Sequence, residues 1–456
     1  SAYPADMTLR TAISEALRHS PQLQPSRDAI ERAEIRQRVA GARYAPRIAP
    51  DFTTGSAPAG LAQHGLGVAV SQLLPTGGEL RGSANSVRMG SGLAEFRDAG
   101  YSFGMSQPLM RGFGATTRAD LRAASDATRE ASRDAADARQ QLVIGAAQVY
   151  FAVVRLQRLA AETDRALARA STLLEMSEAR ARVGLSTQLD VLRAGLLRNQ
   201  AQAAALRGKD ALEAAREDLN LLIGRPSDAV LRVSGDLTED LGALDAAGGG
   251  AGALAPGATP AAALTSSALA GRLDLQNVRA RLDDARRSAS VARWNLLPQV
   301  NLDVDYTRRG LGGSPSPFAS LFNGWRVGLS TTYAFDRASG TAAEGLAELQ
   351  VRAAERAVAD AETRVTLDVQ RAARTAARAD EVVALARTTV DLAGRQRELA
   401  TYRFERGLAD NLDVVDAESN VFQAQSALVG AEIDRAVALL AIRRASGTLD
   451  PERFLQ

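Results

Sequence analysis

Two carboxylates near the end of the chain have a spacing that suits ion chemistry. Asp413 and Asp416 are three positions apart, so on a helix they share one face about one turn apart. Carboxylates gathered at a constriction select cations and bind divalent ions. A solvated helix face is the simpler explanation for any single aspartate, so the argument depends on the elements that carry the pair.

The remaining composition argues against catalysis and against a metal site. The chain has no cysteine and two histidines, His19 and His64, which are far apart in the sequence. A zinc or haem site would need a cluster of such side chains, so we expect no metal and no cofactor. No Ser-His-Asp spacing stands out, and residues 112–114 (Gly-Phe-Gly) lack the Lys-Ser/Thr of a phosphate-binding loop. An enzyme is therefore not expected.

The charge pattern gives no sign of a nucleic-acid partner. The 55 basic and 53 acidic residues nearly balance, and the arginines interleave with acids instead of forming a stripe. No run reaches about 18 apolar residues, so no transmembrane helix is expected. Because the first residue is Ser and not Met, we expect that a signal peptide has been removed.

The elements that carry these acids occur twice. Residues 179–192 return 223 positions further along the chain, so Asp190 of the first copy corresponds to Asp413 of the second. The position of Asp416 is occupied by Arg193 in the first copy. A repeat of this kind predicts a duplicated helical hairpin. We expect the second hairpin to carry the acidic pair and the first to brace it.

Long proline-free tracts surround both copies of the repeat. Each tract is broken once, at Gly184 in the first copy and at Gly407 in the second. The first helix alone would extend roughly 100 Å at 1.5 Å per residue, far beyond an average helix of about 11 residues. Such lengths require a coiled-coil or tubular architecture. We expect helices over residues 8–45 (interrupted by Pro21 and Pro25), 115–182, 188–223, 264–297, 340–406 and 410–446.

The shorter helix of each hairpin has the spacing of a coiled-coil seam. Apolar or small residues recur there at intervals of three and four, and the small ones allow helices to approach closely. An ordinary bundle core would explain the seams but not the helix lengths. The seam positions are Leu189, Leu192, Leu196, Asn199, Ala203 and Leu206 in the first copy, and Leu412, Val415, Ser419, Phe422, Ser426, Val429, Ile433, Ala436 and Leu440 in the second.

Between the helical tracts the sequence period changes to two, which indicates strands. Apolar residues alternate with polar or small ones over residues 66–70 and 101–105. The first such section is 28 residues longer than the second, which predicts an additional hairpin there. We expect second-copy strands at 300–306 and 325–335, a tight turn at 75–78, and longer loops at 57–65, 89–100 and 310–318.

Prolines mark the expected junctions between strands and helices, at Pro46, Pro108 and Pro298. Short alternating strands separated by turns are the weak signature of a bacterial outer-membrane barrel. Strands cross lipid only as a closed barrel, which leaves no backbone group unpaired. Roughly four to six strands per chain are too few for a wide channel, so about three chains would share one barrel. A small soluble β domain on a coiled-coil stalk is the alternative.

Three sequence elements together resemble the TolC family of outer-membrane efflux proteins. They are residues 106–112 (Ser-Gln-Pro-Leu-Met-Arg-Gly), the Leu185 and Leu408 tips, and residues 407–417. The similarity covers essentially the whole chain, including the tandem repeat. It implies a mixed fold of α-helices and transmembrane β-strands, in which a trimer shares one outer-membrane β-barrel continuous with a long periplasmic α-helical coiled-coil tube. The Gly/Pro-rich residues 225–263 would lie in a collar around that tube.

Residues 106–112 and the Pro-Thr-Gly-Gly turn are most similar to family members that export proteins, such as the RTX toxin exporters for adenylate cyclase toxin. The resemblance implies type I secretion. A homotrimeric channel in outer-membrane lipid would conduct an exported protein from an inner-membrane ABC transporter and a periplasmic membrane-fusion adaptor, with most of its mass in the periplasm. The alternatives are a drug or metal efflux duct and, from another class, a soluble coiled-coil scaffold.

The resemblance also implies roles for residues at the hairpin tips. Where TolC has a tyrosine and an arginine in its latch, this chain has Phe404 and Ala409, so those latch bonds cannot form. The expected constriction residues are Asp190, Asp413 and Asp416, and the candidate latch residues are Arg193, Arg403 and Arg406. The tip residues expected to dock the adaptor are Val183, Gly184, Leu185, Arg406, Gly407 and Leu408.

The repeat and the changes of period together set the expected domain organisation. The first copy has helices over 8–46, barrel strands with the extra hairpin over 47–109, and long helices with a tip hairpin over 113–224. A flexible linker over 225–263 separates the copies. The second copy has helices over 264–298, barrel strands over 299–336, long helices with a tip hairpin over 339–447, and a tail over 448–456.

Overall fold

The computed structural model describes residues 7–57, 61–91, 94–114, 116–184, 186–234, 261–311, 322–333, 337–406, 408 and 411–455. The chain divides into two compact units, and each unit takes segments from both copies of the repeat. Unit 1 comprises Ser1–Arg27, Arg133–Gln276 and Ala361–Gln456, and unit 2 comprises Asp28–Ser132 and Asn277–Asp360. Most of the expected linker 225–263 and of the expected loop 310–318 lies outside the described residues.

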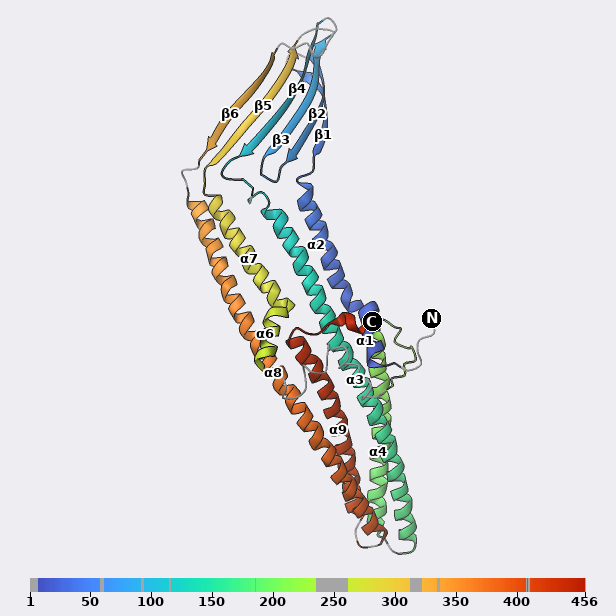
Figure 1. Cartoon of the computed structure of the whole chain (residues 1–456). Helices are drawn as coiled ribbons and strands as arrows, with labels where there is room; N and C mark the ends of the chain where they lie inside the picture. The colour runs from blue at the N-terminus through green and yellow to red at the C-terminus, as the bar shows by residue number, and fades with distance from the viewer. Residues whose placement is uncertain are drawn as a thin grey trace. The chain divides into compact units, whose positions relative to one another are not determined.

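Unit 2 contains one antiparallel sheet of six strands, arranged in chain order (Figure 1). Four strands come from the first copy of the repeat and two from the second, and the pairing of the fourth strand with the fifth joins the copies. In the described part of the sheet, the first and last strands each pair with one neighbour, so the sheet is open. The strands are β1 (Arg47–Ala57), β2 (Leu61–Leu73), β3 (Glu79–Ser91), β4 (Ala94–Pro108), β5 (Gln299–Leu311) and β6 (Phe322–Thr332).

The sheet has one apolar face and one polar face, because side chains alternate along each strand and directly paired residues share a face. On the apolar face Tyr306 lies opposite Trp325, with ring centroids 5.0 Å apart. On the polar face Asp303 accepts hydrogen bonds from Ser106 (2.6 Å) and Ser330 (2.9 Å). Exposed side chains of the apolar face include Ile48, Phe52, Leu66, Val68, Val70, Phe103, Met105, Val327 and Leu329.

The strands extend further than their alternating patterns predict. The expectation of loops over 57–65 and 89–100 is wrong for much of both segments, because β2 begins at Leu61 and β4 begins at Ala94. Glycine, serine and charged residues give these segments the composition of loops, although neighbouring strands supply their hydrogen-bond partners. A Cβ on Gly65 would lie 2.4 Å from Thr53 Oγ1, so glycine there makes room for the facing side chain.

A tight turn joins β2 to β3 where Pro75-Thr76-Gly77-Gly78 predicts it. Gly77 has a φ of 88°, a conformation that glycine adopts without strain, and the N–H of Leu74 donates to Gly78 O at 2.6 Å. Of the three candidate junction prolines, Pro46 and Pro298 directly precede β1 and β5, and Pro108 is the last residue of β4.

Helices make up most of the remaining described chain. The two longest have 64 and 68 residues, close to the lengths that the proline-free tracts predict. Thr8 caps the first helix in a reciprocal capping box with Thr11. The helices are α1 (Leu9–His19), α2 (Gln24–Ala42), α3 (Ala119–Arg182), α4 (Gln188–Leu222), α6 (Ala261–Gly271), α7 (Leu273–Trp294), α8 (Ala338–Glu405) and α9 (Asn411–Ala445), with 3₁₀ turns η1 (Pro21–Leu23) and η2 (Pro451–Phe454).

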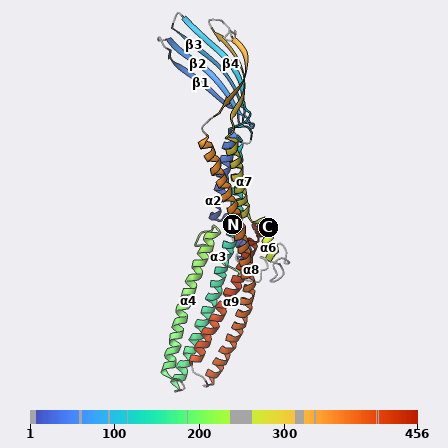
Figure 2. The ribbon, with the colours of Figure 1, turned by 90° about the vertical axis from the view of Figure 1, so that its left-hand side faces the viewer.

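In unit 1 the four long helices run alongside one another as two hairpins, α3 with α4 and α8 with α9 (Figure 2). Ion pairs connect neighbouring helices. Lys209 on α4 pairs with Asp164 on α3 at 3.2 Å, and Glu432 on α9 lies between Arg158 on α3 (3.4 Å) and Arg387 on α8 (3.2 Å). The helix α4 also lies against α9, so the two hairpins pack on each other.

The main hydrophobic core of unit 1 is built around α3. Tyr150 and Phe151 are fully buried with ring centroids 5.6 Å apart, and they pack with Leu9 of α1, Leu219 of α4 and Leu440 of α9. Among the described helices, α3 alone has an 18-residue stretch (mean hydropathy 1.3) long and apolar enough to cross a membrane, and 44% of that stretch is buried. The sequence contains no uninterrupted apolar run of that length.

The seam predicted for α9 is buried over only half of the helix. Ile433, Ala436 and Leu440 lie in the core, but Leu412 and Ser419 are exposed. In the half of α9 that follows the tip, a different stripe with the same spacing is buried, formed by Val414, Ala417, Val421 and Ala424. The heptad spacing thus predicts a coiled-coil helix correctly but selects the wrong face near the tip, because both faces carry apolar or small residues there.

Both copies of the repeat end in the same local geometry. Gly224 and Gly447 have φ values of 77° and 71°, and each lies against the end of a helix. A Cβ on Gly224 would lie 2.7 Å from the carbonyl oxygen of His19 at the end of α1. A Cβ on Gly447 would lie 3.2 Å from the main chain at Gly271, the end of α6. The duplication in sequence is therefore also a duplication of packing.

Candidate functional site

The two hairpins of unit 1 share a small buried apolar cluster near their tips. Leu173 of α3, Ala194 of α4, Phe404 of α8, and Val414 and Ala417 of α9 belong to it. Because four helices contribute, the cluster joins the ends of both hairpins within one chain. The candidate residues of the sequence are distributed around this cluster.

Asp190 is a capping residue of α4. Its Oδ2 accepts hydrogen bonds from the N–H of Thr187 (2.9 Å), from Thr187 Oγ1 (2.7 Å) and from Ser186 Oγ (3.0 Å). In return the N–H of Asp190 donates to Thr187 Oγ1 at 3.3 Å, which completes a capping box. The side chain is 8% exposed, so in the single chain its carboxylate holds the start of α4 and meets little solvent.

Arg193 lies one turn further along α4 and near the same carboxylate. Its Nη1 is 4.0 Å from Asp190 Oδ1, at the outer limit of an ion pair. At that separation, and with Arg193 partly exposed, the pair contributes little to stability. Arg193 therefore belongs to the neighbourhood of the α4 cap.

Asp413 and Asp416 are both exposed at the start of α9. They alternate with Val414 and Ala417, which are buried in the shared cluster, so the carboxylates project away from that cluster. Asp413 is in the first turn, where the positive end of the helix dipole favours a negative charge. The two aspartates thus differ from Asp190, because their carboxylates face outward and are accessible to ions or to other chains.

The contact between the two hairpins at their ends is made by a residue that the sequence did not single out. Arg180, near the end of α3, donates from Nη1 to the carbonyl oxygen of Phe404 at 2.6 Å. The guanidinium carbon also lies 4.8 Å from the centre of the Phe404 ring, in cation–π geometry. Phe404 lacks the hydroxyl of a tyrosine latch, but its ring and its main chain are both held by Arg180. The repeat offers the one signal for this residue, since Arg180 is equivalent to Arg403.

The candidate latch arginines of the second hairpin make local contacts. Arg406 stacks over Tyr402 of the same helix, with 5.0 Å between the guanidinium carbon and the ring centre. Arg403 accepts the N–H of Leu408 at its carbonyl oxygen (2.8 Å), and its side chain is exposed.

The expected docking residues lie at the ends of both hairpins. Val183 and Leu408 are exposed, at 68% and 67%, although both are apolar. Gly184 has a φ of 76°, which ends α3 in a left-handed turn, and open space surrounds the position where a Cβ would be. Leu185, Gly407 and Ala409 lie outside the described residues.

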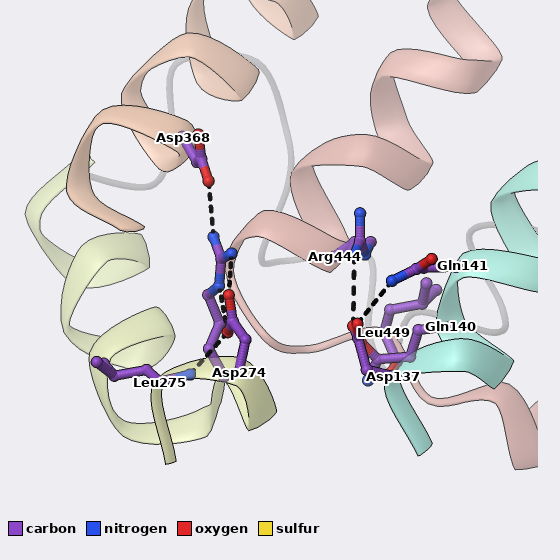
Figure 3. A network of polar contacts seen from close by, with 9 residues as sticks. Asp137, Gln140, Gln141, Asp274, Leu275, Asp368, Arg444 and Leu449 are labelled. Atoms are coloured by element: carbon purple, nitrogen blue, oxygen red, sulfur yellow. Dashed lines mark hydrogen bonds and ion pairs between the residues drawn. The ribbon is translucent and has the colours of Figure 1, made fainter. Parts of the chain in front are cut away.

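A polar network lies elsewhere in unit 1, at the start of α7 (Figure 3). Arg272 pairs with Asp274 at 2.6 Å and with Asp368 of α8 at 3.2 Å. Burial raises the pKa of Asp274, but the hydrogen bonds and charge of Arg272 lower it by more, so the pKa is below its ordinary value. Arg444 of α9 and Gln141 of α3 both contact Asp137 of α3, and this second group lies across a cavity of about 390 Å³ from the first (Figure 3). The first group braces the start of α7 against α8, and the second joins α3 to α9.

Taken together, a duplicated helical hairpin with exposed apolar tips and an open amphipathic sheet define a channel-type envelope protein. The sequence profile of the outer membrane efflux protein family matches residues 12–225 and 264–448, and the chain belongs to this family. Its members are transport proteins and not enzymes.

One curated relative is the pyoverdine export outer membrane protein OpmQ of Pseudomonas putida. It is 31% identical over 202 residues, which are 41% of this chain and 39% of the relative. The chain therefore matches about two fifths of that relative's length.

Solved channel structures share the fold over nearly the whole chain. The structure of CusC has a TM-score of 0.74 at 16% identity and covers 97% of this chain and 92% of its own. VceC of Vibrio cholerae has a TM-score of 0.70 at 20% identity, with 96% of each chain covered. The open state of MtrE of Neisseria gonorrhoeae has 0.70 at 19%, covering 98% and 93%. At these identities the similarity concerns the fold.

Proposed function

We propose that the chain is one subunit of a trimeric outer-membrane channel whose tip, at the ends of the two hairpins, opens and closes a passive duct. The observation that carries the proposal is the open amphipathic sheet. Its apolar face is exposed, and within the described part of the chain the edge strands β1 and β6 each have an unpaired edge, which lipid does not tolerate. Three copies of the six-stranded sheet would supply 18 strands, enough to close a wide barrel.

Exposed apolar seams in unit 1 support assembly with further copies. On α4 the seam residues Leu189, Leu192 and Leu196 are 54–63% exposed, although a coiled-coil seam is ordinarily buried. On α8 Leu385 and Leu392 repeat at a heptad spacing and are similarly exposed. Two different exposed seams, one on each hairpin, suit a head-to-tail contact that closes into a ring. Channels of this family generally form trimers and work with adaptors and inner-membrane transporters.

Within a trimer, Asp413 and Asp416 would each form a ring of three carboxylates, and we assign the constriction to them. Asp190 would serve the gate indirectly by fixing the start of α4. The test is single-channel conductance of the double variant Asp413→Ala, Asp416→Ala in planar bilayers. We expect higher conductance and loss of block by divalent cations, because the rings bind cations at the narrowest point. Unchanged conductance together with unchanged divalent block would contradict the assignment.

The tips Val183-Gly184-Leu185 and Arg406-Gly407-Leu408 are proposed to dock a periplasmic membrane-fusion adaptor. The exposed apolar side chains of Val183 and Leu408 and the open space around Gly184 support this role. Replacing Gly184 and Gly407 with tryptophan should abolish crosslinking of the adaptor to the tips while the trimer persists. If crosslinking and export both survive these bulky substitutions, docking takes place elsewhere.

For the cargo we propose an exported protein, delivered by an ABC transporter in type I secretion, on the strength of residues 106–112 and the Pro-Thr-Gly-Gly turn. A small-molecule cargo is the second candidate. OpmQ, which matches this chain over about two fifths of its own length, is a pyoverdine export protein. Deleting the gene and measuring both a secreted protein and a secreted siderophore separates the two. Loss of one product with the other intact identifies the cargo class.

We also propose that the strands over 47–109 and 299–336 form the barrel section, that the remaining helical segments lie in the periplasm, and that 225–263 belongs to a collar. Labelling of introduced cysteines by a membrane-impermeant maleimide in intact cells would test these boundaries. Sites at residues 58–60 and 92–93, which lie between consecutive strands in the sequence, should react from outside, and sites on α9 should not.

A further inference from the structure

The apolar face of the sheet contains a groove that runs along β3. The residues of β3 on this face, Gly82 and Ala84, are small, whereas their cross-strand neighbours are large. Val70 and Phe103 lie on either side of Gly82, and Val68 and Tyr101 lie on either side of Ala84. The resulting groove has a volume of about 620 Å³. A Cβ on Gly82 would lie 3.4 Å from the Phe103 ring, so the aromatic side chain forms one wall.

Basic side chains lie on the same face beyond this groove, toward the end of β3 that is remote from the helices. Continuing along β3 on the same face, Ser86 is followed by Arg88, which lies directly between His64 of β2 and Arg97 of β4. Arg308 of β5 lies opposite Tyr101, beside the groove. Arg88 and Arg97 are exposed. Both guanidinium groups have interactions within the sheet, and their side-by-side placement lets one anion contact both of them.

We propose that the β3 groove and its arginines bind a membrane lipid with a phosphate headgroup, the acyl chain lying in the groove and the phosphate against Arg88 and Arg97. The inference rests on the proposed placement of the sheet in a membrane. From Gly82 to Arg88 the strand extends about 20 Å, comparable with one leaflet of a hydrocarbon core about 30 Å thick.

The chemistry of the groove favours a lipid over a free anion. Its walls are hydrocarbon and aromatic, and Tyr306 and Trp325 adjoin it on the same face, as aromatic side chains do at a membrane interface. The two guanidinium groups already interact with their own surroundings in the sheet. Five donors per guanidinium leave capacity for a phosphate as a further acceptor, held in bidentate geometry.

The test is lipid binding by native mass spectrometry, using the full chain purified as its oligomer in detergent and freed of endogenous lipid. The probes are phosphatidylglycerol, a diacylglycerol with the same acyl chains but no phosphate, and inorganic phosphate as competitor. The variants are the double Arg88→Gln, Arg97→Gln, and separately Ala84→Leu, which fills the groove without altering charge. Arg326→Gln is the matched control, because Arg326 is on the opposite face of the sheet.

We expect the double variant to weaken phosphatidylglycerol binding by roughly tenfold or more, and Ala84→Leu to weaken binding of both lipids. The control should bind like the unmodified chain, and inorganic phosphate should not displace the lipid. The proposal is overturned if both groove variants bind phosphatidylglycerol normally, if the diacylglycerol binds equally well, or if inorganic phosphate competes completely.

Fractionation of each variant with the outer membrane is measured in parallel. Variants that fractionate normally but show one of these results contradict the lipid site alone, whereas absence of the unmodified chain from the membrane contradicts the proposed function.

Discussion

Equivalent residues of the two repeat copies have different surroundings at the tips. Asp190 and Asp413 occupy the same position in the repeat, but Asp190 closes a capping box with Thr187, whereas Asp413 faces outward. The sequence contained a sign of this difference, since Thr187 and Asp190 have the spacing of a capping box. The sequence repeat therefore predicts that the two hairpins share an architecture. The role of each carboxylate depends on the residues around it.

Replacing Asp190 with alanine should destabilise the start of α4. Loss of a capping interaction costs about 1 kcal/mol, so amide hydrogen exchange over residues 186–194 should accelerate about fivefold. The measurement is exchange followed by mass spectrometry. Asp416→Ala is the matched control, because that carboxylate is exposed and has no capping role. Equal exchange in both variants would show that the capping box contributes nothing.

Arg180→Gln should loosen the contact between the hairpins. It removes the hydrogen bond to the Phe404 carbonyl and the stacking on its ring, a charged bond worth about 1.5–3 kcal/mol and a cation–π contact worth about 0.5–2 kcal/mol. In the proposed channel, we expect higher single-channel conductance and faster amide exchange over residues 402–406. Arg182→Gln, at an exposed position two residues away, should leave both unchanged. If Arg180→Gln and Arg182→Gln give the same conductance and the same amide exchange, Arg180 does not brace the hairpins.

At the scale of elements, the sequence predicted most helices and the turn at 75–78, because proline placement and glycine chemistry act locally. It failed where the outcome depends on partners. The segments 61–65 and 94–100 are strands because neighbouring strands pair with them, and the buried stripe of α9 near the tip begins at Val414 because the first hairpin covers that face. Arg180 was missed for the same reason, since its partner is 224 residues away.

The brace at the start of α7 should weaken in acid. The pKa of Asp274 is lowered below the ordinary value of 3.8, so its ion pair with Arg272 contributes stability above that pH and loses it as pH falls through the folded pKa. We expect Asp274→Asn to lower the unfolding temperature at pH 7. The variant should then lose less unfolding temperature than the unmodified chain between pH 5 and about pH 3. The measurement is circular dichroism melting, with the exposed Asp283→Asn as control. Parallel pH curves for both variants would contradict this role.

The exposed seam of α4 should be required for assembly and not for folding of the chain. Leu192→Glu with Leu196→Glu should weaken association at least tenfold, because each leucine buried at an interface is worth about 1.5–3 kcal/mol. Light scattering in detergent measures the oligomer, and circular dichroism checks the helices. Arg198→Glu, on the same helix but off the seam, is the control. An intact trimer in the double variant would mean that α4 does not face a second copy.

At the scale of the whole molecule, the described part of one chain leaves three features incomplete: the edges of its sheet, the apolar face of that sheet, and the exposed seams of α4 and α8. All three are satisfied together by closed association of identical chains in a membrane. No single residue predicts this, since the features come from both copies of the repeat. The six strands also exceed those of either copy, which carry four and two. Closure thus depends on the combined sheet and not on one half of it.

Closure between chains can be tested directly because the chain has no cysteine of its own. We expect a cysteine at Ala49 on β1, combined in turn with a cysteine at Arg326, Gly328 or Ser330 on β6, to form a disulfide with the neighbouring copy in at least one combination. All four positions are on the polar face, and β1 and β6 are the edges that a ring of copies would bring together. Oxidised samples should contain covalent dimers and trimers on denaturing gels. Disulfides confined to single chains would mean that the six-stranded sheet closes on itself. The control for random oxidation is a pair of cysteines at Ala49 on β1 and Ser71 on β2. Because β2 is not an edge strand, this pair should form no disulfide between copies.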